Sequence, residues 1–195
     1  MVEIPPKLRK KPPPVIADED VTHCIVTGMG EPLMDDFMRA GNYLAKKGEV
    51  FDVIGANRSC QLIRTDMNFS LDRDNIRYWK SVSLNRSGPW HSGQPAATKS
   101  KKDYPWVHYW WPMVQGAGSS AWGAAKVAFL MGYEEVILCG VPLEQGPYAD
   151  GIYAPTFQDD MITIQSMRDR IEMDDWMHPH VLSMSGWTKW FLGAP

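Results

Sequence analysis

The stretch GAGSSAWGAAKVAFLMGYEEVILCGV, residues 116–141, decides the fold that we predict. It begins as a loop of glycine and serine, continues as a helix of small residues, turns at Gly132 and ends in an apolar strand. The first N–H groups of a helix have no partner within it, and the positive end of the helix dipole lies there, which suits a phosphate or a carboxylate. We therefore predict a small-molecule site at Gly118, Ser119 and Ser120. The alternative is a glycine-rich connection that binds nothing.

A strand, a turn and a helix are predicted near the start of the chain. Residues 22–27 form a short apolar run that ends at Gly28 and Gly30. Such a run, closed by glycines, predicts a buried strand followed by a tight turn. Apolar residues then recur at helical spacing between Pro32 and Gly48, which predicts a helix with one buried face.

A second strand is predicted at residues 50–56, and it leads directly into Asn57. Parallel strands end at the same edge of a sheet, and ligands of open α/β sheets bind at this carboxyl edge. We therefore expect the Asn57 side chain to lie beside the glycine turn that follows the first strand.

The middle of the chain gives weaker signals. Residues 76–84 and 106–113 are rich in aromatic and β-branched side chains, so we expect a third and a fourth strand there. Residues 85–105 contain many Ser, Gly, Pro and Lys residues, which favours a long surface loop. A solvent-facing lid and an ordinary loop are both open for this segment.

The last third of the chain predicts a strand at 135–139, a loop at 141–157, a helix from Asp159 to about residue 175, a strand at 180–184 and a helix at 187–192. The loop leaves its strand at the carboxyl edge, so we expect it to form a third wall of the site. Its polar candidates are Glu144, Gln145, Tyr148, Asp150 and Tyr153. The helix after the loop is expected to bury Met161, Ile164, Met167 and Ile171.

The alternation of strands and helices predicts one Rossmann-like α/β domain over residues 21–195, with a mainly parallel sheet flanked by helices. Residues 1–20 are predicted to be an extended arm, because residues 4–14 hold five prolines and four basic residues. The arm could contact another subunit or protein, and a solvated tail is the alternative.

Composition disfavours several classes of protein. The net charge is −3 although the arm is basic, so the body is acidic and unsuited to broad nucleic-acid binding. No apolar run approaches the ~18–20 residues of a membrane span, and we expect no signal peptide. Cys24, Cys60 and Cys139 form no CxxC pair, so we expect packed, reduced thiols in a cytoplasmic protein.

Three segments resemble successive motifs of the small Rossmann-like bacterial sialyltransferases. They are GMGEPL at 28–33, FDVIGANRS at 51–59 and SSAWGAAKVAFLMGYEEVILCGVPLEQG at 119–146. The same segments are similar to motility-accessory glycosyltransferase and pterin pyrophosphokinase-like domains. The resemblance covers about half of the chain. The ending VLSMSGWTKWFLGAP, at 181–195, resembles that of short phage and prophage proteins of unknown role.

The resemblance implies a site for a nucleotide sugar. Gly28 and Gly30 would line the nucleotide, and Asn57 would hold the reacting region of the sugar. Ser120, with Ser119 beside it, would contact the nucleotide at the start of a helix. Transfer in the sialyltransferase branch would need no metal or other cofactor.

The resemblance also implies catalytic positions, and the chain departs from the family at several of them. Tyr148 or Tyr153 would offset charge on the departing phosphate. The family's first tyrosine falls on Glu144, which we keep as a nucleotide-binding candidate. The expected Asn of the first motif is Met29, and the expected Asp of the third is Pro142.

The catalytic histidine of the family has no counterpart between residues 109 and 177. His178 and His180 are the nearest substitutes by position, and His180 is our candidate base. A metal site at these two histidines is disfavoured, because no Cys or acidic ligand of regular spacing lies near them in the sequence. The fold and a nucleotide pocket therefore carry over from the family better than the reaction does.

Three hypotheses follow. The leading one is a protein that binds a nucleotide or nucleotide sugar, with glycosyltransferase-like transfer of a sugar from a CMP or UDP donor. The alternative is a catalytically silent, phage-type binding or structural protein on the same fold. A Mg²⁺-dependent pyrophosphoryl transferase is the third, with Asp150 as its best-placed carboxylate. The acidic pairs at 35–36 and 159–160 are better explained as helix caps or solvated charges.

Overall fold

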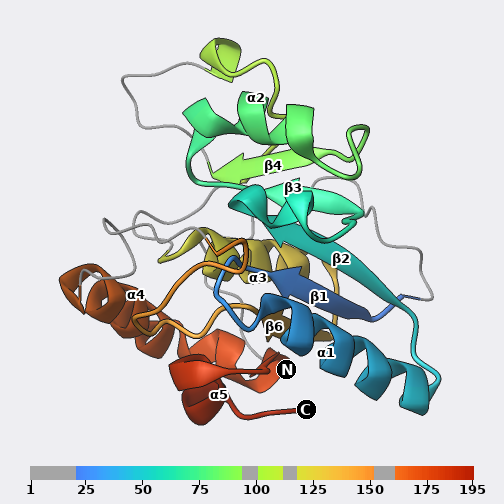
Figure 1. Cartoon of the computed structure of the whole chain (residues 1–195), viewed down its shortest axis with the longest axis vertical. Coiled ribbons are helices and arrows are strands. Elements are labelled where there is room, and N and C mark those ends of the chain that lie inside the picture. Colours follow the sequence, from blue (N-terminus) through green and yellow to red (C-terminus); the bar gives the residue numbers. More distant parts are fainter. Residues whose placement is uncertain (1–20, 94–100, 112–117, 152–160) are drawn as a thin grey trace.

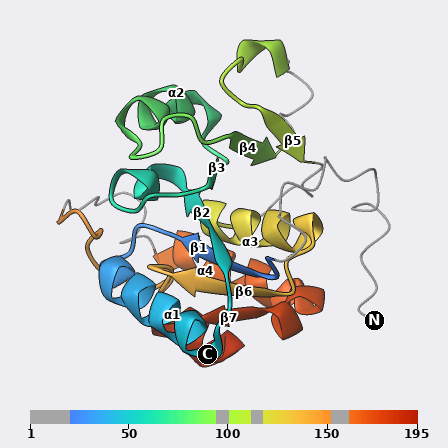
Figure 2. The same cartoon turned by 90° about the vertical axis from the view of Figure 1, so that its right-hand side faces the viewer.

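The computed structural model describes residues 21–93, 101–111, 118–151 and 161–195, and the predicted N-terminal arm lies outside them. Seven parallel strands form one sheet (Figure 1), and their order, which can be followed by the labels in Figure 2, is β5-β4-β3-β2-β1-β6-β7. The strands are β1 (His23–Thr27), β2 (Phe51–Ala56), β3 (Met67–Phe69), β4 (Trp90–Gly93), β5 (Tyr109–Trp111), β6 (Glu135–Cys139) and β7 (Val181–Ser183). The predicted Rossmann-like α/β fold with a mainly parallel sheet is confirmed.

Helices cover both faces of the sheet. They are α1 (Leu33–Lys47), α2 (Arg73–Val82), α3 (Ser120–Met131), α4 (Met161–Met173) and α5 (Gly186–Leu192), with short 3₁₀ helices η2 (Asn57–Gln61), η3 (Lys101–Asp103) and η4 (Asp175–His180). In Figure 2, α1 and α2 lie on one side of the sheet and α3 lies on the other. The predicted helix that ends at Gly48 is confirmed, because Gly48 adopts the left-handed conformation directly after α1.

The interior strands are buried on both faces. Cys24 and Val26 of β1 pack in the core beneath α3, whereas Ile25 packs in the core beneath α1. Helix α3 packs on β1, β2, β3 and β6. The small residues Ala121, Ala124, Ala125 and Ala128 of α3 are all buried, which lets the helix lie close on the sheet. Both faces of the sheet are apolar, which explains why β1 and β6 are continuous hydrophobic runs in the sequence.

The predicted third strand at 76–84 is wrong, because this segment belongs to helix α2. Ile76 and Trp79 are its buried residues, and they lie three positions apart, as one face of a helix requires. The actual third strand, β3, has only three residues. It is too short to show an alternating pattern in the sequence.

The long loop predicted at 85–105 is also wrong in part, because it contains the fully buried strand β4. The polar side chains of β4 make hydrogen bonds inside the protein. Ser92 Oγ donates to the carbonyl of Ser70 at 2.6 Å, and Trp111 Nε1 donates to His91 Nδ1 at 3.0 Å. Burial lowers the pKa of His91 to about 4, so its ring is neutral in the core.

The later elements follow the prediction closely, and β6, α4, β7 and α5 are all present. Ile164 and Ile171 are buried as expected. Met161 is 47% exposed, so its predicted burial is wrong. Met161 is the first residue of α4, and the first turn of this helix does not pack on the apolar core. Asp159, the predicted helix cap, lies outside the described residues.

The order of the strands creates a topological switch between β1 and β6. From β1 the chain adds strands outward through β2, β3 and β4 to β5, and it then returns to place β6 on the other side of β1. The loops after β1 and β6 consequently leave the sheet in opposite directions, and a crevice opens between them.

Candidate functional site

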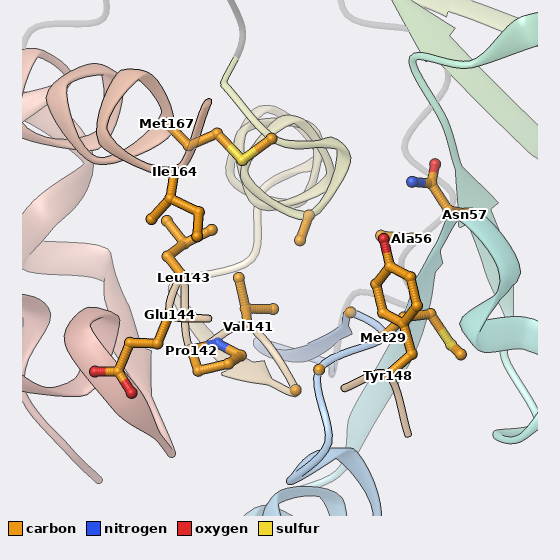
Figure 3. Close-up of a pocket in the computed structure, with 14 residues that line it drawn as sticks. Met29, Ala56, Asn57, Val141, Pro142, Leu143, Glu144, Tyr148, Ile164 and Met167 are labelled. Carbon is orange, nitrogen blue, oxygen red and sulfur yellow. The ribbon is translucent and has the colours of Figure 1, made fainter. Parts of the chain in front are cut away.

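A pocket occupies the carboxyl edge of the sheet at this switch between β1 and β6. It has a volume of about 140 Å³. Its walls come from the turn after β1, the end of β2, the loop after β6 and the helices α3 and α4. The lining residues are Gly28, Met29, Gly30, Ala56, Asn57, Ala121, Gly140, Val141, Pro142, Leu143, Glu144, Tyr148, Ile164 and Met167. In Figure 3, Asn57 and Tyr148 lie on one wall, and Ile164 and Met167 lie on the opposite one.

Gly28 and Gly30 are needed for the close approach of two backbones. A Cβ on Gly28 would lie 2.5 Å from the carbonyl oxygen of Gly140, and one on Gly30 would lie 2.5 Å from Cδ of Pro142. Their N–H groups donate to the carbonyls of Cys139 and Gly140, each at 2.8 Å. The two glycines line the pocket as predicted, but their N–H groups are already bonded to protein.

The loop after β6 is held against the turn after β1. Gly30 and Tyr148 form an antiparallel bridge. The N–H of Glu31 donates to the carbonyl of Pro147 at 3.1 Å, and the N–H of Ala149 donates to that of Met29 at 2.9 Å. These backbone contacts fix the position from which the Tyr148 side chain extends toward the pocket.

Asn57 stands at the end of β2 in a left-handed conformation, with φ at 56°. This conformation is costly for most residues and is better tolerated by asparagine. Ser70 Oγ donates to Asn57 Oδ1 at 2.8 Å and so fixes the amide. Because the Asn57 oxygen already accepts this hydrogen bond, its NH₂ group is the part of the amide that can donate to a ligand at the pocket wall.

Tyr148 and Glu144 carry the ionisable groups of the described pocket wall, and Tyr148 lies beside Asn57. The Arg58 guanidinium lies 4.6 Å from the centre of its ring, and Arg58 Nη2 is 3.2 Å from Asp150 Oδ2. Burial is the main cause that raises the pKa of Tyr148, the charges of Asp150 and Asp72 add to it, and the Arg58 charge opposes it. The phenol is therefore protonated at neutral pH and can donate a hydrogen bond.

The serines at the start of α3 do not line the pocket. Ser119 Oγ accepts from the N–H of Trp122 at 3.1 Å and caps the helix. Ser120 is buried, and its Oγ accepts from the N–H of Leu71 at 3.2 Å. Ala121, the next residue, lines the pocket instead, so the first turn of α3 still contributes to the wall. Gly118 lies against Arg170 in a separate hollow beside α4.

Glu144 lies between the pocket and a second hollow of about 420 Å³. Both spaces share Pro142 and Glu144, so they adjoin. Figure 3 shows the Glu144 carboxylate turned away from Tyr148. Glu144 can therefore contact a ligand only at the end of the cleft that faces the second hollow.

Leu143, which lies between Pro142 and Glu144 in the chain, has φ at 49°. A branched side chain rarely adopts this left-handed conformation. Its carbonyl accepts from Arg168 Nε at 3.1 Å and from Nη2 at 2.8 Å. The same guanidinium lies 5.1 Å from the centre of the Trp187 ring. A bidentate, stacked arginine thus stabilises a strained part of the pocket wall.

Asp36 ties the loop after β6 to the rest of the molecule. It is 1% exposed, and its Oδ2 accepts from the N–H of Gly140 at 2.9 Å and from Ser185 Oγ at 2.5 Å. Burial raises its pKa. The explanation of Asp36 as a capping or solvated charge is therefore wrong, because it connects α1 with the ends of β6 and β7.

His180 lies at the other edge of the sheet, before the first residue of β7. Its ring packs 4.6 Å from that of Phe129, and its Nδ1 is 3.2 Å from the carbonyl of Glu134. His178 Nε2 lies 2.8 Å from the carbonyl of Ile171. The structure thus does not bring the candidate base to the pocket. Tyr153 lies outside the described residues.

No cluster of three or more His, Cys, Asp or Glu side chains suited to a metal ion occurs among the described residues. Asp150, the candidate Mg²⁺ ligand, forms its ion pair with Arg58 instead. Asp174, the residue before η4, is buried, and it binds Lys126 and accepts from Trp122 Nε1 at 2.8 Å. Asp174 therefore links α3 to η4, away from the pocket wall.

No known family model matches this chain, and no curated protein matches it either. The three free cysteines are all buried, as predicted. None of the described helices has the length and apolar character needed to cross a membrane.

Sequence reasoning missed much of the pocket. The structure brings together five predicted residues, namely Gly28, Gly30, Asn57, Glu144 and Tyr148. The missed residues are mostly apolar, and only Ile164 and Met167 were signalled by helical spacing. Ser70 was missed because β3 is too short to recognise. The result is an apolar cavity with an amide and a phenol on one wall, which suits a ring-shaped ligand that carries hydroxyl groups.

Proposed function

We propose that this protein binds a nucleotide or a nucleotide sugar in the pocket between β1 and β6, as a glycosyltransferase-like protein. The observation that carries the proposal is the position of the pocket at the topological switch of a parallel sheet, where α/β proteins bind such ligands. The resemblance of three segments to nucleotide-sugar transferases adds support, since all three contribute to the pocket wall. We also propose a cytoplasmic setting, which the buried, unpaired thiols support.

The shape of the cleft supports a ligand with two parts. Ligand pockets commonly enclose about 300–1,000 Å³, more than the 140 Å³ between β1 and β6. The adjoining hollow of about 420 Å³ gives the remaining room. A base or a sugar ring would occupy the apolar pocket, and the rest of the ligand would extend past Pro142 and Glu144.

The chemistry of the wall supports sugar transfer through two groups. The NH₂ of Asn57, which has no hydrogen-bond partner among the described residues, would orient the sugar by a hydrogen bond. The protonated phenol of Tyr148 would donate to the departing phosphate and stabilise the charge that develops there. In this proposed reaction the bond from the sugar to the nucleotide phosphate breaks, the sugar bonds to an acceptor hydroxyl, and the proton of that hydroxyl passes to the departing phosphate, without a metal ion.

Thermal unfolding in the presence of CMP, UDP, GDP, ATP and their sugars, with and without Mg²⁺, tests the binding proposal. A ligand at a hundredfold its Kd should raise the melting temperature by about 5–10 °C. We expect this from CMP or UDP compounds without Mg²⁺. Asn57→Gly should abolish the shift, since glycine keeps the left-handed backbone and removes only the amide. Asn42→Ala, an exposed asparagine of α1, is the control. No shift with any nucleotide refutes the proposal.

A second candidate function is binding without catalysis, and a specific observation favours it. His180 lies at the opposite edge of the sheet, and the described pocket wall contains no histidine. A chromatographic assay separates the two functions. It follows the release of CMP or UDP from whichever nucleotide sugar raises the melting temperature. Release that falls in Tyr148→Phe supports transfer. Binding without release, in the presence of a range of acceptor sugars, supports the silent protein.

A further inference from the structure

Arg58 lies on a fixed piece of backbone beside the pocket wall. It is the second residue of η2 and directly follows Asn57. On one side of it, Ser70 Oγ donates to Asn57 Oδ1 at 2.8 Å. On the other side, Ser59 Oγ donates to the carbonyl of Thr27 at 3.1 Å. The backbone of Arg58 is therefore held to the end of β1 and to the residue that follows β3.

The Arg58 guanidinium joins this backbone to the loop after β6. Its central carbon lies 4.6 Å from the centre of the Tyr148 ring. Its Nη2 lies 3.2 Å from Asp150 Oδ2 and 3.4 Å from Oδ1. The side chains of Arg58 and Asp150 are only 24% and 19% exposed, so water and salt screen these contacts less than they screen a surface pair. Asp150 consequently holds the guanidinium against the aromatic ring.

Tyr148 is restrained both at its backbone and at its ring. The antiparallel bridge with Gly30 fixes the backbone, and the guanidinium restricts rotation of the side chain. A planar guanidinium can stack on a ring and pair with a carboxylate at the same time, with little freedom lost for each contact. In Figure 3 the phenol oxygen of Tyr148 lies on the side of the pocket where Asn57 lies. Arg58 therefore helps to set where this oxygen stands in the pocket.

Arg58 also changes the strength of Tyr148 as a hydrogen-bond donor. Burial is the largest cause that raises the pKa of Tyr148, and the charge of Arg58 is the next contribution and lowers it. The charges of Asp150 and Asp72 raise the pKa further. A positive charge close to a phenol favours loss of its proton, so the O–H becomes a stronger donor to a negatively charged group. Arg58 thus offsets part of the effect of burial.

We infer that Arg58 is a positioning residue of the pocket, whose guanidinium, held by Asp150, fixes the Tyr148 ring at the pocket wall and strengthens the phenol as a donor to a phosphate. This inference rests on the proposed function, because it explains how that site would stabilise the departing phosphate. It assigns a role to a residue that does not itself line the described pocket. A contact that only stabilised the fold would leave the acidity of the phenol unchanged.

Titration of the Tyr148 phenol in the free protein tests the inference without any ligand. The protein is labelled with 3-fluorotyrosine, whose phenol is more acidic than that of tyrosine, and is followed by ¹⁹F NMR. Tyr148→Phe identifies the signal of Tyr148. In Arg58→Met the pKa of Tyr148 should rise, because the positive charge is lost while an unbranched side chain remains. Arg58→Lys keeps the charge but loses the planar fork, so its Tyr148 pKa should lie between those of the wild type and Arg58→Met.

Arg64→Met is the matched control, because Arg64 is exposed in the segment after η2 and should leave the pKa of Tyr148 unchanged. A Tyr148 pKa in Arg58→Met that is equal to or below that of the wild type overturns the inference. If Arg58→Met does not fold, Arg58→Gln takes its place, because its amide can still donate to Asp150. The same rise in pKa is expected there.

The rate of nucleotide release tests the part of the inference that concerns transfer. With the nucleotide sugar that raises the melting temperature, Arg58→Met should lower kcat about tenfold and change KM less than about threefold. The phenol donates to charge that develops only in the transition state, so a weaker donor affects kcat more than binding. Arg58→Lys should recover part of kcat. An unchanged kcat, or a loss confined to KM, overturns the positioning role.

The two measurements separate this inference from the proposed function. If no nucleotide binds but the pKa of Tyr148 rises in Arg58→Met, the proposed function is refuted and the placement of Tyr148 by Arg58 stands. If a nucleotide sugar is bound and cleaved but the pKa does not rise, the proposed function stands and the inference is refuted. If a nucleotide binds and is not released, the titration is the deciding measurement.

Discussion

Replacement of the buried Asp36 by alanine should destabilise the protein far more than replacement of its exposed neighbour Asp35. The Asp36 carboxylate accepts the N–H of Gly140 and the hydroxyl of Ser185, and Asp36 is 1% exposed. Hydrogen bonds to charged groups contribute about 1.5–3 kcal/mol each. Removal of a buried carboxylate whose Oδ1 has no partner in the described structure recovers part of this. We therefore expect a net loss of about 3 kcal/mol in the free energy of unfolding.

Urea unfolding followed by tryptophan fluorescence measures this loss. With a slope of about 2 kcal/mol per molar urea, the midpoint should fall by about 1.5 M. Asp35→Ala is the matched control, because the Asp35 side chain is 74% exposed and pairs with Arg39, at 3.5 Å on the next turn, and with no other described residue. An exposed pair of this kind contributes less than about 0.5 kcal/mol. Equal midpoints for the two variants would show that Asp36 does not tie the loop after β6 to α1.

Three further predictions concern the stability of the folded protein. The pKa of Asp36 is raised in the folded protein, so folding favours the protonated carboxyl. The contribution of this carboxyl to stability is therefore present below the ordinary pKa of aspartate and is lost as the pH rises through the folded pKa. The stability cost of Asp36→Asn, measured by urea titrations, should shrink from pH 3.5 to pH 7. Gly186→Ala places a Cβ 2.4 Å from another side chain at φ 62° and should cost about 3 kcal/mol, whereas Gly48→Ala, at φ 77° with open space around it, should cost about 1 kcal/mol by the same assay. Lys126→Met leaves the buried Asp174 without its closest cation and should lower the free energy of unfolding by about 3 kcal/mol, and a loss below 1 kcal/mol would contradict a buried pair.

The two halves of the sheet differ in how far the sequence predicts them. β1, α1, α3 and β6 could be predicted because their buried residues are apolar and follow a regular period. β4 could not, because its buried side chains include a histidine and a serine whose hydrogen bonds lie inside the protein. Such partners are distant in the sequence, so a buried polar strand has the composition of a loop.

Helix α2 shows a different cause of error. Its segment contains aromatic and β-branched residues, which favour strands. Its buried residues Ile76 and Trp79 nevertheless follow helical spacing, and Tyr78 between them is 63% exposed. Periodicity outweighed residue type here, because burial of one face stabilises a surface helix more than intrinsic preference does.

The candidate site was predictable where strand ends alone decide it. Asn57 and the glycine turn come together because parallel strands end at one edge. The serines before α3 signalled a ligand, yet their hydroxyls bind the backbone N–H groups of Trp122 and Leu71. Local sequence cannot tell a serine that caps a helix from one that binds an anion, because both use the same unpaired N–H groups.

The sheet order also has a consequence for synthesis of the protein. β1 lies between β2 and β6, and His23 of β1 pairs with Phe51 on one side and with Glu135 on the other. During translation, one edge of β1 therefore waits unpaired until β6 has left the ribosome. An exposed, apolar strand edge invites pairing with other chains. Nascent chains stalled between α3 and β6 should therefore depend on chaperones, and release of the chain past β6 should end that dependence.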